Sequence, residues 1–239
     1  MCCGNWLRIL TLTLAFSSWP GMPILAQEKS VRPGINDRFK NPDVKEFLGK
    51  FEVESRELYA QRREIVAACR LKPGMAVADV GAGTGLFTRL FAQEVGPAGL
   101  VYAVEIAPRF LEHIKQTSAA EGLKNVKTVL GSQTSTELPT ESIDLAFICD
   151  TYHHFEFPFR TMLSIHHALK PGGQLVLIDF HRIEGKSSPW ILGHVSAGQD
   201  VFVKEITSIG FKLAGEEKFL KENYFARFVK VEKKSAGPD

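Results

Sequence analysis

Residues 78–85 read ADVGAGTG, a glycine-rich stretch between two apolar runs. The run before it is typical of a buried strand, and apolar side chains recur with helical spacing over residues 86–95 after it. Glycine allows the backbone to turn tightly and to approach a ligand closely. The glycines that serve this purpose are Gly81, Gly83 and Gly85. The stretch therefore predicts a strand, a glycine turn and a helix whose first N–H groups face a ligand.

The alternation of strand and helix patterns extends over most of the chain. Apolar runs predict strands at residues 76–80, 100–104, 126–130, 143–149 and 174–180. Helical patterns lie at residues 42–70, 86–95, 108–121, 158–169 and 199–209. The last two apolar segments, 211–219 and 224–231, are typical of a hairpin. We therefore expect an α/β fold: a Rossmann-like, doubly wound, mostly parallel seven-stranded sheet with a C-terminal antiparallel hairpin.

The first of these helices has its own start signal and one interruption. Asn41-Pro42 combines an Asn cap with a proline in the first turn, and the helical pattern weakens near Ser55. Residues 27–41 before it are polar and irregular. We expect the folded domain to cover residues 42–232 and the tail 233–239 to be flexible.

Residues 1–26 differ in composition from the rest of the chain. Arg8 is their only charged side chain, and residues 9–16 form the apolar run ILTLTLAF. The pattern predicts a signal peptide cleaved after Ala26, and hence export to the periplasm or the medium. The run is too short to span a bilayer, so no stable membrane span is expected in the mature chain. The alternative is a cytoplasmic protein that starts at Met22, or an uncleaved apolar tail.

The composition limits the partners. The 239 residues are 44% hydrophobic, enough for one sizeable core. The net charge is +2 without a long Lys/Arg run, so no nucleic-acid partner is expected. Cys69 and Cys149 fall at opposite ends of strands that span roughly 17–20 Å, whereas a disulfide needs Cα atoms within about 7 Å. No disulfide is therefore expected between them, and the oligomeric state stays open.

Glu105 stands at the end of the second predicted strand, in VYAVEIAP. It lies 20 residues after Gly85 (105 − 85). A carboxylate at this place can accept hydrogen bonds from both hydroxyls of a ribose. Ile106 follows it and can press on the face of an adenine. A glycine turn alone is a weak signal, because nicotinamide and flavin proteins use related ones.

Four stretches together carry a resemblance to a known family. They are VADVGAGTG at 77–85, VEIAP at 104–108, LPTESIDLAF at 138–147 and LKPGGQLVLID at 169–179. The chain resembles the class I S-adenosylmethionine-dependent methyltransferases, in particular the small-molecule type of ubiquinone and menaquinone biosynthesis. The resemblance implies that residues 42–232 form a methyltransferase domain, that S-adenosylmethionine is the cofactor, and that a small molecule is the methyl acceptor.

The resemblance also implies roles for single residues. Glu105 would bind the ribose of the cofactor. The methionine end would meet the turn after the first strand, namely Asp79 and the backbone of Gly81, Ala82 and Gly83. These assignments place the cofactor over the glycine turn.

The adenine would meet the two residues after the third strand, Ser132 and Gln133. Many relatives carry Asp at position 132, and serine accepts hydrogen bonds more weakly than a carboxylate. Either the cofactor affinity is reduced or Gln133 substitutes. The N-terminal helix, with Tyr59, would cover the cofactor. Arg62 or Arg63 would meet the methionine carboxylate, or else both belong to a solvated helix face.

DTYHHF at 150–155 follows the fourth predicted strand and so lies beside the transferable methyl group. Methyl transfer depends mainly on alignment and exclusion of water, and it needs a base only when the acceptor must lose a proton. His153 and His154 are the candidate bases or orienting groups, and Asp150 can orient a histidine or meet the acceptor. The other interpretation is a packed support of the loop. No metal site is expected, because adjacent histidines rarely aim both rings at one ion.

Residues 179–198 add further candidates near the same edge. Asp179 and His181 end the fifth strand. The insert that follows carries an apolar group suited to a lid over an aromatic or lipid-like acceptor: Trp190, Ile191, Leu192 and His194. Ordinary packing over the sheet edge is the alternative.

Three functions from different classes are compatible with these patterns. The first is a methyltransferase acting on a small molecule. The second is a non-catalytic or degenerate S-adenosylmethionine-binding module, which position 132 and the predicted export favour because the cofactor is made in the cytosol. The third is a nicotinamide-dependent oxidoreductase, against which the absence of a Tyr-x-x-x-Lys arrangement and the stretch LKPGGQLVLID argue.

Overall fold

The computed structural model describes residues 27–231. The predicted signal peptide at 1–26 and the predicted flexible tail at 233–239 lie outside the described residues. Among residues 27–231, no helix combines the length and the apolarity that a membrane crossing requires.

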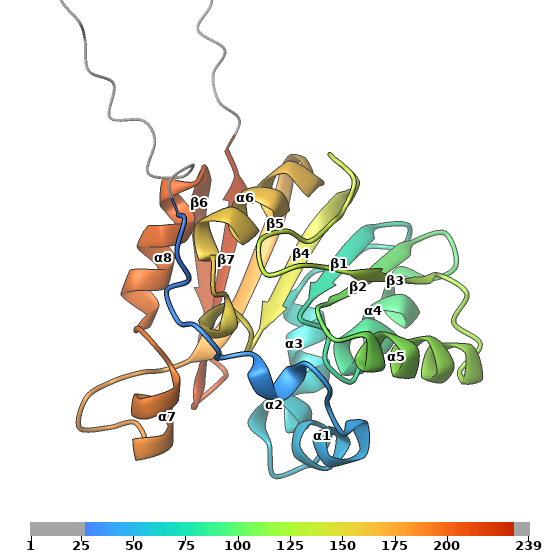
Figure 1. Cartoon of the computed structure of the whole chain (residues 1–239). Coiled ribbons are helices and arrows are strands. Elements are labelled where there is room, and N and C mark those ends of the chain that lie inside the picture. Colours follow the sequence, from blue (N-terminus) through green and yellow to red (C-terminus); the bar gives the residue numbers. More distant parts are fainter. Residues whose placement is uncertain (1–26, 232–239) are drawn as a thin grey trace, which may run out of the picture.

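A seven-stranded sheet forms the centre of the molecule, with the strand order β3-β2-β1-β4-β5-β7-β6 (Figure 1). The strands are β1 (Ala76–Val80), β2 (Leu100–Glu105), β3 (Val126–Leu130), β4 (Ile143–Cys149), β5 (Leu169–Phe180), β6 (Phe211–Glu217) and β7 (Asn223–Lys230). β1 to β5 pair in parallel, and β7 pairs antiparallel with both β5 and β6. The predicted fold class and closing hairpin are confirmed.

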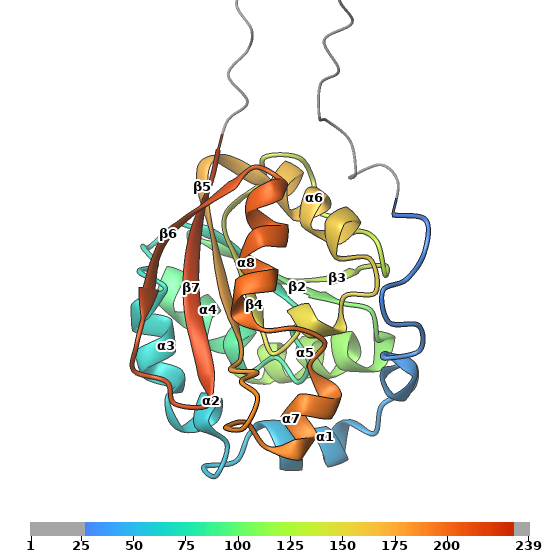
Figure 2. The ribbon, with the colours of Figure 1, turned by 90° about the vertical axis from the view of Figure 1, so that its left-hand side faces the viewer.

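Helices cover both faces of the sheet, as Figure 2 shows. On one face lie α3 (Arg62–Ala68), α4 (Leu86–Val95) and α5 (Pro108–Ala120), and on the other α6 (Pro158–Ala168) and α8 (Gln199–Ser208). Neighbouring side chains of β4 point to opposite faces: Phe147 packs with the α3–α4 cluster and Ile148 with the α6–α8 cluster. Strands buried on both faces explain the continuous apolar runs in the sequence.

The N-terminal helical region differs from the sequence prediction. It is divided into α1 (Val44–Phe51), α2 (Glu57–Ala60) and α3, so the interruption near Ser55 is confirmed. The cap is Asp43 instead of Asn41, because the Asp43 carboxylate accepts from the N–H groups of Lys45 and Glu46. An ionised carboxylate also interacts better with the helix dipole than an amide does.

Two smaller findings concern β5 and the cysteines. β5 begins at Leu169, five residues before the predicted start, because the chain on both sides of its Pro-Gly-Gly turn pairs with β4. The turn is accommodated by a register shift between Ile143 and Leu145. Cys69 and Cys149 are both free thiols, which confirms the absence of a disulfide between them.

Candidate active site

A pocket of about 350 Å³ opens at the carboxyl ends of β1, β2 and β4. This volume lies in the range of small-molecule sites. The turns after these strands supply its polar wall, and aromatic side chains supply much of the rest: Phe39, Phe47, Phe51, Phe155, Phe180 and Trp190. The pocket therefore combines one end rich in backbone N–H groups and carboxylates with one that is largely apolar.

The glycine turn runs between β1 and α4. Gly81 has a φ of +77°, and a Cβ at this position would overlap the side chain of Thr151 in the loop after β4. Only glycine therefore allows these two loops to lie in contact. Gly83 has a φ of +54° and its N–H donates to Glu105 Oε1 at 2.9 Å. The turn is thus tied directly to the end of β2.

Glu105 lies on the pocket wall and is buried. Its second carboxylate oxygen accepts from the N–H groups of Ile106, at 2.8 Å, and Ala107, at 3.3 Å. Burial raises the pKa of this carboxyl, and the three backbone hydrogen bonds oppose that rise. The carboxylate is therefore fixed at the rim of the glycine turn.

Asp79 is buried beneath the same turn and lines the pocket. Thr88 Oγ1 of α4 donates to its Oδ2 at 2.6 Å. Burial raises the pKa of the Asp79 carboxyl to about 7, against the Thr88 hydrogen bond, which lowers it. Nearby Glu105 adds a further upward contribution to this pKa.

Ser132 and Gln133 are exposed residues at the rim. The Ser132 N–H donates to Ser135 O, and Gln133 Nε2 donates to Glu156 Oε1 at 3.0 Å. Ile106 also lies at the rim, 37% exposed. Eight of the nine residues predicted to bind the cofactor line the pocket: Asp79, Gly81, Ala82, Gly83, Glu105, Ile106, Ser132 and Gln133.

The ninth, Gly85, does not line it. A Cβ at this position would come within 2.7 Å of Ile114 Cγ1. Gly85 therefore allows α4 and α5 to pack closely, which is a structural requirement of the same sequence motif.

Asp150 lines the pocket but does not hold a histidine, contrary to one of the two predicted roles. Its Oδ2 accepts from Arg56 at 2.8 Å and its Oδ1 from Asn223 Nδ2 at 2.6 Å. Burial raises the pKa of this carboxyl, and Arg56 opposes the rise. Asp150 has a φ of +47°, a strained conformation for a non-glycine residue that is typical of functional loops.

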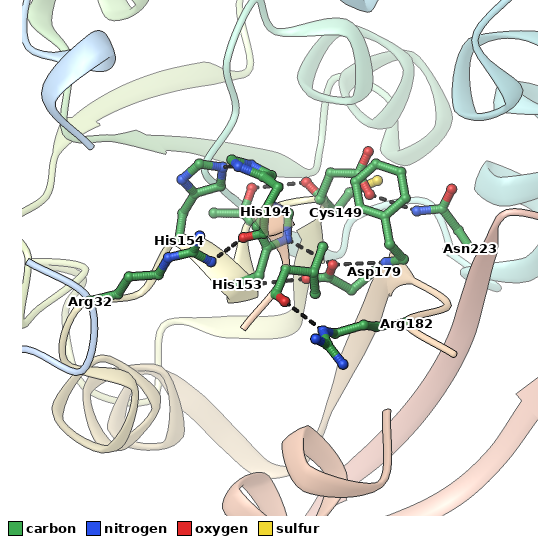
Figure 3. Close-up of polar contacts among 12 residues, drawn as sticks. Arg32, Cys149, His153, His154, Asp179, Arg182, His194 and Asn223 are labelled. Carbon is green, nitrogen blue, oxygen red and sulfur yellow. Dashed lines mark hydrogen bonds and ion pairs between the residues drawn. The ribbon is translucent and has the colours of Figure 1, made fainter. Parts of the chain in front are cut away.

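The acid that contacts a histidine is Asp179, at the end of β5. His153 Nδ1 lies 2.8 Å from Asp179 Oδ1, and both side chains are buried (Figure 3). Burial by itself lowers the pKa of His153, but the charge and hydrogen bond of Asp179 raise it above its usual value. His153 therefore has an oriented ring at the pocket wall.

His154 and His194 complete a cluster of imidazoles on the same wall. The Nε2 atoms of these two residues are 3.3 Å apart. Burial, together with the charge of neighbouring His153, lowers the pKa of His154 to about 2 and that of His194 to about 4. At neutral pH these two rings are uncharged and poorly suited to accept a proton.

The predicted lid is partly present. α7 (Pro189–His194) places Trp190 and His194 in the pocket wall, with their rings stacked at 4.6 Å between centroids. Ile191 packs instead on the core, and Leu192 does not line the pocket. Of the four predicted lid residues, Trp190 and His194 therefore line the pocket, and Ile191 and Leu192 do not.

The arginines that line the pocket are Arg38 and Arg56, not Arg62 or Arg63. Arg62 stacks on Tyr59 and donates to the Tyr59 carbonyl and to Glu54. Helical periodicity does not predict Arg56, because it lies in the interruption between α1 and α2. The sequence patterns also did not predict the position of Glu156 in the pocket wall or the pairing of Asp179 with His153. Both depend on the conformation of the loop after β4.

Comparisons with known proteins agree with this geometry. A family described as "Methyltransferase domain" matches residues 78–177, from the glycine turn into β5. A demethylmenaquinone methyltransferase from Symbiobacterium thermophilum is 32% identical over 118 residues, 49% of this chain and 47% of that protein. The ubiquinone/menaquinone biosynthesis C-methyltransferase UbiE of Bordetella parapertussis is 27% identical over 124 residues, 52% of this chain and 48% of that protein. The matched part spans about half the length of these curated relatives.

A solved structure shares the fold over a longer stretch. A SAM-dependent methyltransferase from Aquifex aeolicus superimposes with a TM-score of 0.70 and 23% identity, covering 80% of this chain and all of that one. Three observations agree with these similarities. They are the sheet in which β7 pairs antiparallel with β5 and β6, the glycine turn after β1, and the sequence matches. Residues 78–177 therefore match a methyltransferase domain, the chain is similar in sequence to enzymes of ubiquinone and menaquinone biosynthesis, and it shares its fold with a SAM-dependent methyltransferase.

Proposed function

We propose that this protein transfers a methyl group from S-adenosylmethionine to an apolar small molecule. The observation that carries the proposal is that one pocket joins the glycine turn and Glu105 to the apolar wall with His153. A donor at the first end and an acceptor at the second would meet inside one cavity from which water is excluded.

The chain's polar groups fit the cofactor. The Glu105 carboxylate lies where it can accept from two ribose hydroxyls, and the glycine turn at Gly81 and Gly83 lines the same pocket. Asp79 offers a second carboxylate near the turn, suited to the ammonium of the methionine moiety. When bound, the cofactor supplies an electrophilic methyl group on a positively charged sulfur, and the surrounding residues have only to align it.

The acceptor is an aromatic or lipid-like compound in this proposal. Eight Phe and Trp side chains line the pocket, and burial of a flat apolar ring among them excludes water and fixes its orientation. The names of the relatives point to menaquinone and ubiquinone precursors. A ring of that kind has an acidic position or hydroxyl whose proton must leave as the methyl arrives. His153, oriented by Asp179, is the side chain best placed to orient it or to accept that proton.

Calorimetric titration with S-adenosylmethionine and S-adenosylhomocysteine tests the proposal first. Micromolar binding of both is expected. Failure of a folded sample to bind either would contradict the cofactor assignment and favour a degenerate module whose glycine turn no longer binds the cofactor. A screen of quinol-like and other phenolic acceptors then tests the transfer itself, with the methylated product detected by mass spectrometry.

Glu105→Ala is expected to weaken S-adenosylhomocysteine binding by about 1.5–3 kcal/mol, the scale of hydrogen bonds to a charged group. Glu105→Gln is the matched control, since its amide oxygen still accepts from some of the backbone N–H groups that the alanine variant leaves unpaired. Unchanged affinity in a folded alanine variant would remove Glu105 from the ribose role.

Export remains part of the proposal. The composition of residues 1–26 supports a cleaved leader, with a cytoplasmic chain that starts at Met22 as the alternative. N-terminal sequencing of the mature protein distinguishes a start at residue 27 from one at residue 22. Neither a nucleic-acid partner nor an oligomeric state is proposed.

A further inference from the structure

Three histidines meet at the apolar end of the pocket. One ring nitrogen from each of His153, His154 and His194 lies within 4.8 Å of the other two. The ring centroid of His153 is 4.4 Å from that of His154 and 5.1 Å from that of His194 (Figure 3). Adjacent residues in sequence thus do aim their rings toward a common centre, once His194 closes the group from α7.

Within the cluster, His154 Nε2 and His194 Nε2 face each other at hydrogen-bond distance, and a metal ion would replace this contact. His153 uses Nδ1 for Asp179, which leaves Nε2 available. A carboxylate behind a histidine is the usual arrangement at metal centres, where it fixes the tautomer and the ring orientation. His154 Nδ1 is buried and has no hydrogen-bond partner among residues 27–231. Packing alone therefore leaves this cluster incompletely satisfied.

Other side chains hold the two histidine-bearing segments in place. Asn36 Nδ2 donates to the His154 carbonyl at 3.0 Å, and Arg32 donates to the carbonyls of Gly193 and His194. Arg182 donates to Leu192 O and Val195 O from the other side of α7. The polar segment before α1 is therefore a strap over the cluster, and His194 has a fixed backbone position.

We propose that His153, His154 and His194 bind one divalent transition-metal ion, with zinc as the best fit. Nitrogen ligands lie about 2.0–2.1 Å from zinc, so two of them in a tetrahedral site are about 3.3 Å apart. The Nε2 atoms of His154 and His194 have this separation, 3.3 Å. The remaining nitrogen pairs lie within 4.8 Å, so metal binding requires the rings to move closer together to reach the same spacing. Buried Asp179 supplies negative charge behind the site, against the positive charges of Arg32 and Arg38.

Three protein ligands leave the fourth position open to the pocket, since all three histidines line it. Sites with an open position are typical of catalytic zinc, whereas structural sites are closed by four protein ligands. In the framework of the proposed function, His153 would then be a ligand and not the base, and the ion would orient the acceptor through an oxygen or sulfur atom. The proton of that hydroxyl or thiol would pass to solvent, and the acceptor would form its bond to the methyl as the methyl–sulfonium bond breaks.

Metal binding is measured on the full chain purified without a histidine tag and stripped of metal by chelator dialysis. Zn²⁺ is titrated in competition with a chromophoric chelator, and Co²⁺ by visible absorption. We expect one ion per chain and the intense Co²⁺ bands of a four-coordinate site. Absence of Zn²⁺ binding at tens of micromolar, or the weak spectrum of octahedral Co²⁺, overturns the proposal.

Matched variants locate the site. His154→Ala and His194→Ala are each expected to weaken Zn²⁺ binding at least 100-fold, and Asp179→Asn 10- to 100-fold. His167→Ala is the control, because His167 also belongs to a His-His pair but is exposed on α6, away from the pocket. Wild-type affinity in folded His194→Ala overturns the assignment. If a histidine variant fails to fold, the Co²⁺ spectrum of the wild-type protein decides alone.

Cofactor binding separates this inference from the proposed function. S-adenosylhomocysteine is titrated into the same samples by calorimetry. Metal binding without cofactor binding contradicts the methyltransferase proposal and leaves the metal site standing. Cofactor binding without metal binding contradicts the metal site and leaves the methyltransferase proposal standing.

Discussion

At the residue scale, Asp79 is a buried carboxyl group with a strongly raised pKa. Its pKa is about 7 in the folded protein and 3.8 when unperturbed, because burial penalises the charged form. A raised carboxyl pKa gives stability that is present below the unfolded value and is lost as pH rises through the folded one. Between about pH 4 and pH 7 the unfolded chain has released this proton while the folded chain retains it.

Asp79→Asn is therefore expected to gain stability relative to the wild type as pH rises. The difference in unfolding free energy should grow by about 1.4 kcal/mol per pH unit at most across that window and level off above pH 7. The asparagine carbonyl can still accept from Thr88. Urea denaturation at several pH values measures the difference, and a pH-independent difference would place the pKa of Asp79 near its usual value.

Arg56 and Asp150 form a partly buried ion pair with side chains 24% and 11% exposed. Arg56→Ala leaves a carboxylate that only Asn223 still contacts, so stability at pH 7 should fall by about 3 kcal/mol. The double variant Arg56→Ala/Asp150→Asn removes the uncompensated charge and should recover most of that loss. A double-mutant cycle from chemical denaturation measures the coupling, and additive effects would show that the pair contributes little.

At the scale of elements, the contact between the loops after β1 and β4 sets the shape of the pocket. Gly81→Ala introduces a Cβ against Thr151 at a positive φ. The strain of the backbone alone costs about 1–2 kcal/mol, and the overlap adds to it. We expect a lower melting temperature and weaker cofactor binding.

A second substitution tests the cause. Thr151→Gly removes the overlapping side chain and should restore part of the stability of Gly81→Ala, although not the part due to φ. Gly74→Ala is a control with a similar φ of +85° and open space around the added Cβ. Equal losses in Gly74→Ala and Gly81→Ala would mean that the loop contact has no energetic effect.

At the scale of the whole molecule, the two core clusters meet through the central strands. Phe147 of β4 is fully buried, and its ring centroid is 4.9 Å from those of both Phe87 and Phe91 of α4. Phe147→Ala should destabilise the protein by about 3–5 kcal/mol, because the transfer energy is lost and a cavity remains. Ile183→Ala, at a position 44% exposed, is the control and should change stability by less than about 0.5 kcal/mol. Thermal and urea unfolding of both variants provide the comparison.

Much of this architecture was readable from the sequence. Apolar runs predicted β1, β3 and β4 with their correct bounds. β1 and β4 lie inside the sheet and are largely apolar because both of their faces are buried, whereas β3 is an edge strand that includes Lys127 and Thr128. The glycines and Glu105 predicted the ligand edge, since a positive φ and a carboxylate at a strand end have few other uses. These features are local, and each depends on a short stretch of chain.

Only the tertiary structure decided the partners of the polar groups. Asp179 meets His153 across 26 positions, and His194 meets His154 across 40. Likewise Arg56 rather than Arg62 reaches the pocket, because the helix pattern is interrupted there. Periodicity reports which face of an element is buried, whereas the meeting of side chains from different loops depends on strand order and on the path of α7. The sequence by itself therefore determined the sheet and its ligand edge, and the three-dimensional packing of distant segments decided which side chains face one another across the pocket.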